Sequence, residues 1–325
     1  MANVKKQNNF WIKLHKPIIA VAPMAGYTDS AFRFICRKYG ADMAYTEMIS
    51  ADALFYDSKK TLKMLEFNKK EKPVVCQLFG KRPEMFAKAV QVVEKYGYDG
   101  IDINFGCPAR KVVAHGGGVT LMRNLDKCYE IIKTVCDAAT VPVSIKIRAS
   151  IKSKTSDKII TALDMVEKIK DLPIKAIMIH GRSYEGGFSG EIDFEMIKKV
   201  KEKFKGIVLG NGGILKPEHA KLMLEKTGVD GVGLARGLWK KPYLGKQIKQ
   251  YLKNGEYKTW DLKKIKKLAL EHAKLMDELK GERGIREMRK FLLFYFKGFP
   301  GASDARQKLV RVENLNDIIK VLQKI

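Results

Sequence analysis

The stretch PVVCQLFGKRPEMFAKAVQVVEKYGYDGIDINF, residues 73–105, decides the fold class of this 325-residue chain. Two short apolar runs, 73–79 and 100–105, flank a segment (85–96) whose apolar residues recur every three or four positions, as on one face of a helix. A strand, a helix and a second strand in this order imply that the two strands pair in parallel. The stretch therefore predicts a βαβ unit.

The same alternation continues along most of the chain. Strand candidates lie at residues 18–22, 42–47, 73–79, 100–105, 143–148, 176–180, 206–211 and 231–236, with helical patterns such as 161–172 between them. Eight such units in a chain of this length predict an α/β fold, a (β/α)8 TIM barrel. An open doubly wound sheet is the alternative, but no GxGxxG motif follows the first strand.

Strand signals stop at about residue 241, and the segments 262–281, 285–299 and 315–325 have helical patterns. Residues 241–325 carry 21 Lys and Arg against 10 Asp and Glu, about twice the charge density of the preceding part. We therefore predict a barrel domain at 1–240 and a smaller, basic, all-helical domain at 241–325. The alternative is that the tail packs as extra barrel helices with a solvated lysine face.

The net charge of +26 suits a polyanionic partner, such as nucleic acid or an acidic membrane surface. Because 49 of the 62 basic residues are lysines, a compositional bias of the genome could also produce this excess. No apolar run approaches the roughly 20 residues of a membrane helix, and residues 1–10 lack the apolar core of a signal peptide. We expect a cytoplasmic protein without a membrane partner.

The five cysteines are odd in number, scattered and without a CxxC pair, and the histidines show no HExxH spacing. This pattern argues against a disulfide framework and against a zinc site. We expect no metal and a monomeric protein, although the sequence does not show the oligomeric state.

Polar residues lie at or near the end of almost every predicted strand, and TIM barrels carry their chemistry at the carboxyl ends of the strands. Each residue alone has an ordinary structural explanation, but together they predict one active site at the barrel mouth. These residues are Glu47, Gln77, Asn104, Lys146 with Arg148, His180 with Arg182, Asn211 and Arg236.

Two glycine-rich turns, GNGGI (210–214) and GLARG (233–237), follow the seventh and eighth predicted strands. Such turns let backbone N–H groups approach a phosphate, and Arg236 could bind it with two parallel hydrogen bonds. Gln77, Asn104 and Lys146 suit a planar, hydrogen-bonding ring. The set fits flavin mononucleotide (FMN), although spacing alone does not separate a flavin from a phosphosugar.

Cys107 stands between Gly106 and Pro108 at the end of a predicted strand. Pro108 stops the strand, and Gly106 permits backbone angles that other residues avoid. These residues place the cysteine on a turn, but they leave open whether it packs there or reacts.

Several motifs together resemble the tRNA-dihydrouridine synthase family. They are APMAGYTDSAFR (22–33), DINFGCPARKV (102–112), IHGRSYEGGFSG (179–190), GNGGI, LARG and, as in the bacterial B-type branch, REMRKFLLFYFKGFPGASDAR (286–306). The resemblance implies an FMN-dependent oxidoreductase that reduces the C5–C6 double bond of D-loop uridines in tRNA with NADPH. It further implies hydride transfer from flavin N5 and a proton from Cys107, the catalytic acid.

The resemblance also implies two sets of binding residues. Those for FMN are Pro23, Met24, Ala25, Gln77, Lys146, His180, Asn211, Gly212, Gly213, Ala235 and Arg236. Asn104 would lie at the uracil, and we assign further tRNA contacts to Arg110, Lys111, Arg182, Arg286, Arg289 and Lys290. Arg110 and Lys111 could equally belong to a solvated loop. Two positions depart from the family pattern: Gly213 replaces a frequent acid, and Phe291 stands where a histidine is common.

Two rival functions remain. One is a small-molecule flavin reductase of the dihydroorotate or dihydropyrimidine dehydrogenase kind, which the basic tail argues against. The other is a non-catalytic RNA-binding relative, which Cys107 and the two glycine turns argue against.

Overall fold

The computed structural model describes residues 9–325, so the prediction about a signal peptide falls mainly on residues outside this range. Eight parallel strands close into a barrel in the order β1-β10-β9-β8-β5-β4-β3-β2. They are β1 (Ile18–Val21), β2 (Met43–Ser50), β3 (Val74–Phe79), β4 (Gly100–Asn104), β5 (Val143–Arg148), β8 (Ala176–His180), β9 (Ile207–Asn211) and β10 (Gly231–Leu234). The predicted TIM barrel is confirmed.

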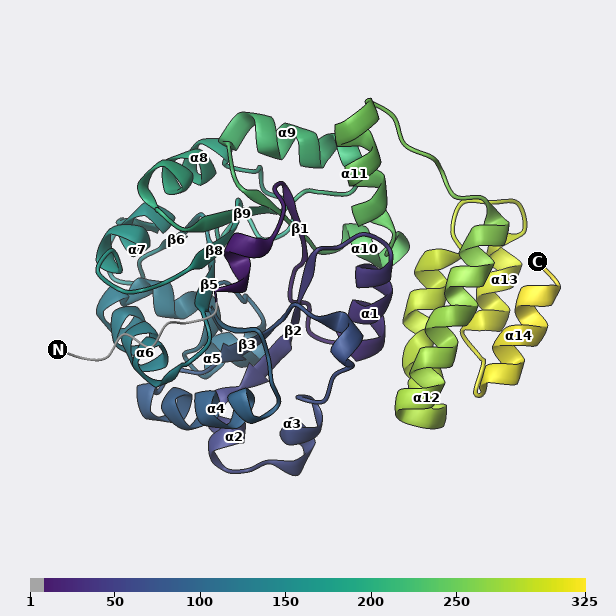
Figure 1. Cartoon of the computed structure of the whole chain (residues 1–325), viewed down its shortest axis with the longest axis horizontal. Coiled ribbons are helices and arrows are strands. Elements are labelled where there is room, and N and C mark those ends of the chain that lie inside the picture. The colour runs from purple at the N-terminus through teal and green to yellow at the C-terminus, as the bar shows by residue number, and fades with distance from the viewer. Residues whose placement is uncertain (1–8) are drawn as a thin grey trace.

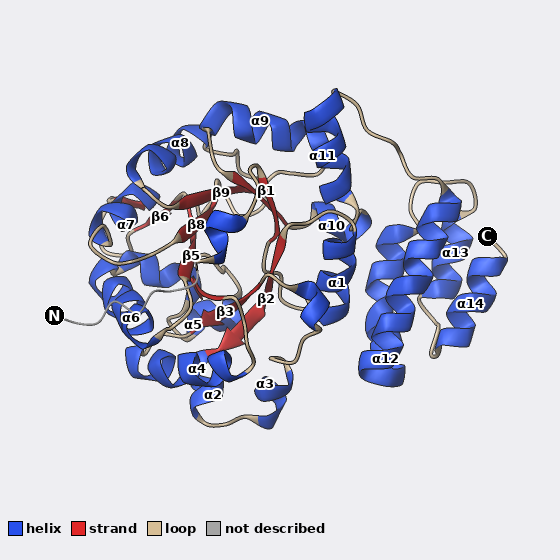
Figure 2. Cartoon of the chain, in the orientation of Figure 1, coloured by secondary structure: helices blue, strands red, loops and turns tan. Residues whose placement is uncertain are grey.

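Helices surround the barrel, as Figure 2 shows. They are α1 (Ser30–Lys38), α2 (Ala51–Phe55), α3 (Lys59–Lys63), α4 (Pro83–Lys95), α5 (Arg110–Ala114), α6 (Leu125–Ala138), α7 (Ala162–Lys168), α8 (Phe194–Lys203), α9 (Pro217–Thr227), α10 (Gly237–Lys240) and α11 (Leu244–Asn254). Three short 3₁₀ helices accompany them: η1 (Phe10–Lys13), η2 (Lys69–Glu71) and η3 (Gly118–Arg123). In α4, Pro83 occupies the first turn, and Phe86, Val90 and Val93 belong to the buried face.

Alternation along the strands separates two apolar layers. On β3, Val74, Cys76 and Leu78 belong to the layer beneath the helices, whereas Val75 belongs to the barrel interior. Successive side chains of a strand point to opposite faces, so Gln77 also points into the barrel. This parity decides which polar residues reach the mouth.

A hairpin that we did not predict follows β5. It consists of β6 (Ser150–Lys152) and β7 (Ile159–Thr161), which pair antiparallel. Three-residue strands are too short to show a periodicity, and the polar linker 153–158 resembles an ordinary loop. The helix predicted at 161–172 is shorter in the structure, because α7 begins after its N-cap, Thr161, and already ends at Lys168.

The C-terminal helices lie beside the barrel (Figure 1). They are α12 (Leu262–Tyr295), α13 (Ala302–Leu309) and α14 (Leu315–Gln323). The two helices predicted at 262–281 and 285–299 correspond to two helical segments of α12, which meet at a kink where Gly281 has φ 57° and ψ −145°. On the barrel side, the wholly buried rings of Phe32 and Phe291 stack with centroids 5.0 Å apart.

The helix α11 belongs to the barrel wall, because it packs on α9. Gly40 and Gly245 allow its start to approach the chain after α1, since a Cβ on Gly40 would lie 2.5 Å from the backbone nitrogen of Lys246. The division into two domains remains our proposal. The packing of α11 would place the boundary in the segment 255–261 instead of at residue 240.

Candidate active site

The predicted mouth residues occupy inward positions at the carboxyl ends of five neighbouring strands. Along these strands, side chains that face the surrounding helices alternate with side chains that face the barrel interior, as on β3. The predicted polar residues fall on the interior-facing positions. The register pairs Asn104 with Lys146 and His180 with Asn211 across adjacent strands. The structure thereby brings together Gln77, Asn104, Lys146, His180 and Asn211.

The Cys107 turn is fixed by hydrogen bonds from both sides. The N–H groups of Gly106 and Cys107 donate to Asn104 Oδ1 at 3.0 and 2.9 Å. Arg148, which is 2% exposed, donates from Nε to the carbonyl of Gly106 at 3.0 Å. Burial raises the pKa of the Cys107 thiol. The thiol therefore stays protonated at neutral pH and can act as an acid.

Lys146 places a cation beside this turn. Its Nζ donates to Asn211 Oδ1 at 3.2 Å, and Asn211 Nδ2 donates to the carbonyl of Gly233 at 2.7 Å. Burial, and then the charge of Arg148, lower the pKa of Lys146 to about 8. The ammonium group is therefore charged at neutral pH in a weakly solvated site, where it can stabilise developing negative charge.

His180 is a neutral imidazole. Burial lowers its pKa to about 2, with further contributions from the charges of Lys146, Arg148 and Arg182. A Cβ on Gly212, whose φ is +111°, would lie 3.3 Å from His180 Nε2 and 2.9 Å from Ile192 Cδ1. Glycine at this position leaves the backbone open beside the ring.

The turn after β9 has the form of an anion site. Gly212 and Gly213 both have positive φ, and an ideal Cβ on Gly213 would lie 3.9 Å from Arg182 Nη2. Burial and the charge of Arg236 lower the pKa of Arg182, so the two guanidinium groups are close enough to repel each other. Arg182 Nη1 is buried without a hydrogen-bond partner in the described part of the chain. An anion between these groups would offset the repulsion between the two guanidinium groups and would accept a hydrogen bond from Arg182 Nη1.

The loop after β1, which contains Pro23, Met24 and Ala25, is tied at Gly26. The Gly26 N–H donates to Glu47 on β2, and its carbonyl accepts from Lys290 on α12. Glu47 projects at a shift in the β2–β3 register between Tyr45 and Met48. The loop therefore joins the mouth to the C-terminal helices.

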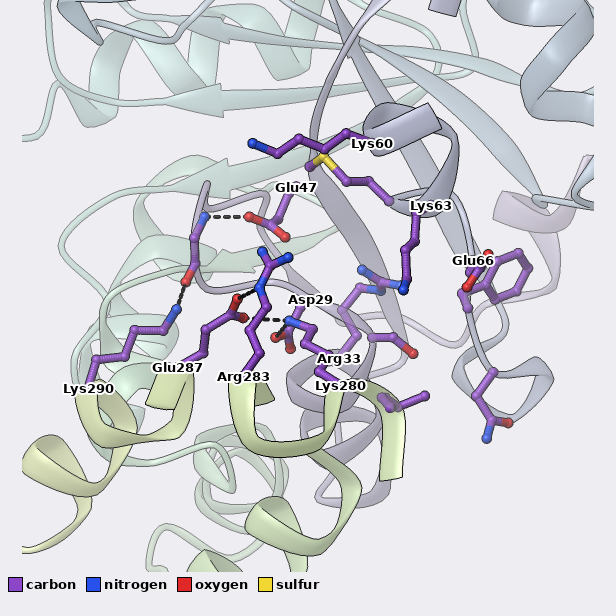
Figure 3. Close-up of a pocket in the computed structure, with 16 residues that line it drawn as sticks. Asp29, Arg33, Glu47, Lys60, Lys63, Glu66, Lys280, Arg283, Glu287 and Lys290 are labelled. Atoms are coloured by element: carbon purple, nitrogen blue, oxygen red, sulfur yellow. Dashed lines mark hydrogen bonds and ion pairs between the residues drawn. The ribbon is translucent and has the colours of Figure 1, made fainter. Parts of the chain in front are cut away.

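A cleft of about 970 Å³ opens beside this loop, between the barrel and α12 (Figure 3). Its walls carry both signs of charge with an excess of cations. The lining includes Gly26, Asp29, Arg33, Glu47, Lys60, Lys63, Met64, Lys280, Arg283, Glu287 and Lys290. The cations on its walls are of the kind that bind phosphate groups.

The predicted tRNA contacts lie in different surroundings. Arg110 and Lys111 are exposed at the start of α5, directly after the Cys107 turn. On α12, Arg286 is exposed, whereas Arg289 Nε donates to the carbonyl of Val312 at 2.8 Å. Lys290 bonds the carbonyl of Gly26, so Arg286 is the most accessible of the three basic residues on α12 that we assigned to tRNA.

A family model for dihydrouridine synthases matches residues 20–325. The chain belongs to the dihydrouridine synthase family. It is 34% identical over 309 residues to a protein of Synechocystis sp. named "Probable tRNA-dihydrouridine synthase 1", covering 94% of this chain and 85% of that one. It is 33% identical over 298 residues to the tRNA-dihydrouridine synthase B of Pseudomonas aeruginosa, covering 91% and 89%. The predicted resemblance, including the B-type branch, is confirmed.

Solved structures share the barrel at much lower identity. The 6-hydroxypseudooxynicotine amine oxidase of Pseudomonas geniculata N1 superposes with a TM-score of 0.55 at 14% identity. The superposition covers 75% of this chain, and the chain spans about half (49%) of the length of that oxidase. This likeness concerns the fold alone.

Within residues 9–325, no helix is long and apolar enough to cross a membrane. In the same range, no group of three or more His, Cys, Asp or Glu side chains could hold a metal ion.

Some residues of the mouth and of the cleft were missed by the sequence-based assignment. Asp102 interrupts the apolar strand β4, and this interruption was a usable signal. Lys60, Lys63 and Arg283 line the cleft, but they come from α3 and α12, more than 200 residues apart. Only the tertiary structure brings these three together.

Proposed function

We propose that the protein is an FMN-dependent tRNA-dihydrouridine synthase that reduces the C5–C6 double bond of D-loop uridines in tRNA, with NADPH as reductant. Family membership and the geometry of the mouth support this proposal. The Cys107 turn is the observation that carries it, because a thiol kept protonated by burial lies beside Lys146 at the mouth. A cytoplasmic location follows from the substrate.

The residues at the mouth fit FMN. Gly212, Gly213, Ala235 and Arg236 would hold its phosphate. Arg182 Nη1, which has no hydrogen-bond partner among residues 9–325, favours the same role for Arg182 instead of a tRNA contact. Neutral His180 and cationic Lys146 would contact the ring, with Gln77, Asn211 and the backbone of Pro23, Met24 and Ala25 around it. When bound, FMN supplies to uracil C6 the hydride that it has taken from NADPH.

Cys107 completes the reaction by donating its proton to C5 of the base. The turn would present the thiol to the base, and Asn104, at the head of the turn, would lie at the uracil pocket. Loss of the proton leaves a thiolate, and the charges of Lys146 and Arg148 stabilise it. Solvent then returns a proton to the sulfur.

The cleft would receive the tRNA. A uridine must leave its stack to reach a barrel mouth, and this costs a few kcal/mol, less for an exposed loop nucleotide. Cations on α3 and α12 would bind phosphates on either side of the extruded base. The basic C-terminal helices thus favour tRNA over a free pyrimidine, the substrate of the rival flavin reductases.

The test is Cys107→Ala. We expect the variant to bind FMN and to oxidise NADPH as the parent does, because the thiol acts only on the uracil side. Dihydrouridine formation should fall by roughly 10²–10⁴-fold, the usual contribution of a positioned general acid. The measurements are flavin absorbance, NADPH consumption, and mass spectrometry of tRNA nucleosides.

Cys136→Ala, on the outer helix α6, is the matched control and should behave as the parent. Equal loss of flavin and activity in Cys107→Ala would show that Cys107 is structural. A parent protein that binds no FMN, or that reduces free orotate or uracil but not tRNA, would refute the proposed function.

A further inference from the structure

The barrel interior beneath the Cys107 turn contains a carboxylate to which the proposed function gives no role. Asp102, on β4, is 0% exposed, and its register neighbours on β3 and β5 are Gln77 and Ser144. Branched apolar residues usually fill the interior of a TIM barrel. A carboxylate is costly there unless its hydrogen bonds are satisfied. Its presence calls for a physical reason.

Hydrogen bonds connect this carboxylate to the mouth. Ser144 Oγ donates to Asp102 Oδ1 at 2.6 Å, and Gln77 Nε2 donates to Asp102 Oδ2 at 2.7 Å. Gln77 Oε1 in turn accepts from Asn104 Nδ2 at 2.9 Å. Gln77, Ser144 and Asn104 are all buried, so water does not compete for these bonds.

The donor and acceptor roles in this series of hydrogen bonds are fixed at both of its ends. At the mouth, Asn104 Oδ1 accepts the N–H groups of Gly106 and Cys107, and a backbone N–H can only donate. Asn104 must therefore turn its NH₂ group toward Gln77. At the inner end, burial raises the pKa of Asp102 to about 6, so its carboxylate is ionised at neutral pH and can only accept.

We propose that Asp102 is a positioning residue for the Cys107 turn, acting through Gln77 and Asn104. The proposal rests on the proposed function, in which Cys107 donates the proton. As an acceptor, Asp102 holds the Gln77 amide in one orientation. If that amide reversed, its NH₂ group would face the NH₂ group of Asn104, and the support of the turn would be lost.

Three variants separate this role from a merely structural one. Asp102→Val removes the acceptor and places an apolar, strand-compatible side chain in the interior. Asp102→Asn keeps a carbonyl oxygen that can accept from Gln77 Nε2. Ser144→Ala is the matched control, because it removes the other hydrogen bond to the same carboxylate. It leaves intact the hydrogen bonds that connect Asp102 to the Cys107 turn.

Two measurements apply to each variant. The first is the rate at which iodoacetamide alkylates Cys107, followed by mass spectrometry of its peptide. The second is kcat per bound flavin and KM for tRNA. In Asp102→Val we expect a severalfold change in the alkylation rate and a kcat lower by about 10–100-fold, the effect of a misplaced catalytic group, with little change in KM. Asp102→Asn and Ser144→Ala should remain close to the parent.

Equal alkylation rates and equal kcat per bound flavin in Asp102→Val and the parent would overturn the proposal. An Asp102→Asn variant as slow as Asp102→Val would overturn the acceptor role. If Asp102→Val does not fold, Asp102→Ala replaces it in both measurements. A parent without dihydrouridine synthesis would refute the proposed function instead, whereas the alkylation rates would still report on the turn.

Discussion

At the scale of single residues, Asp102 connects stability to pH. Burial, opposed by the hydrogen bonds from Ser144 and Gln77, raises its pKa to about 6, above the ordinary value of 3.8. The folded protein therefore favours the protonated form. This contribution to the free energy of unfolding is fully present below about pH 4 and is lost as the pH rises through about 6.

We predict that Asp102→Asn stabilises the protein at pH 7 but not at pH 4. A shift of about two pKa units corresponds to at most about 3 kcal/mol in the free energy of unfolding at pH 7. Urea unfolding at both pH values measures the effect, with Asp157→Asn in an exposed loop as the control. A change of the same size at both pH values, or destabilisation at pH 7, would contradict this account.

At the scale of elements, the break in α12 positions the cleft. Gly281 has φ 57° and ψ −145°, a conformation that residues with a Cβ rarely adopt. Lys280, directly before the break, bonds both Asp29 at the N-terminus of α1 and Glu287 beyond the break, each at 2.7 Å. The break thus lets one helix meet the barrel and still present Arg283 to the cleft.

Gly281→Ala should lower stability and weaken tRNA binding. No atom lies within 4 Å of the added Cβ, so the cost arises in the backbone and amounts to about 1–3 kcal/mol. Displacement of the cleft wall should weaken tRNA binding roughly fivefold, or about 1 kcal/mol. Thermal unfolding and a tRNA binding titration test both effects.

Gly255→Ala is the matched control, because Gly255 also has positive φ in open space but lies outside the cleft lining. It should lose about 1 kcal/mol of stability and retain the parent affinity for tRNA. If the two variants bind tRNA equally well, the break in α12 has no part in substrate binding.

At the scale of the whole molecule, the net charge of +26 favours a polyanionic partner, and six of the cations among residues 9–325 line the cleft. We predict that replacing Lys60, Lys63 and Arg283 with alanine weakens tRNA binding and flattens its dependence on salt. Each lost phosphate contact should lower the slope of log affinity against log salt concentration by about 1. NADPH oxidation should not change, because none of the three side chains is among the mouth residues. The measurement is tRNA affinity across a salt series.

The control for this prediction removes the same charge elsewhere. Lys198, Lys203 and Lys205 are exposed on and directly after α8. Their triple alanine variant should reduce affinity only slightly and keep the slope. Equal effects of the two triple variants would show that tRNA affinity depends on the overall charge of the protein and that tRNA does not bind preferentially in the cleft.

The barrel and its mouth could be predicted from the sequence, because apolar runs, helical periodicity and strand parity are local signals. Residues such as Lys146 and His180 stand out as polar ends of apolar strands. The cleft could not be predicted, since its walls come from distant segments. The partners of Arg289 and Lys290 were also inaccessible, because both side chains bond carbonyl groups that only the tertiary fold brings within reach. The assignment of individual mouth residues to FMN and to uracil stays a prediction.

The aromatic contact between the barrel and α12 has a consequence for synthesis on the ribosome. Phe32 emerges with the first tenth of the chain, but Phe291, which stacks on it, emerges only near the end. Until then, a barrel that is otherwise complete carries an uncovered aromatic surface at α1. Premature termination in the linker after α11 would leave this surface permanently open, and such products should aggregate. The helices that are translated last therefore also cover the aromatic surface of α1 and so protect the protein from aggregation.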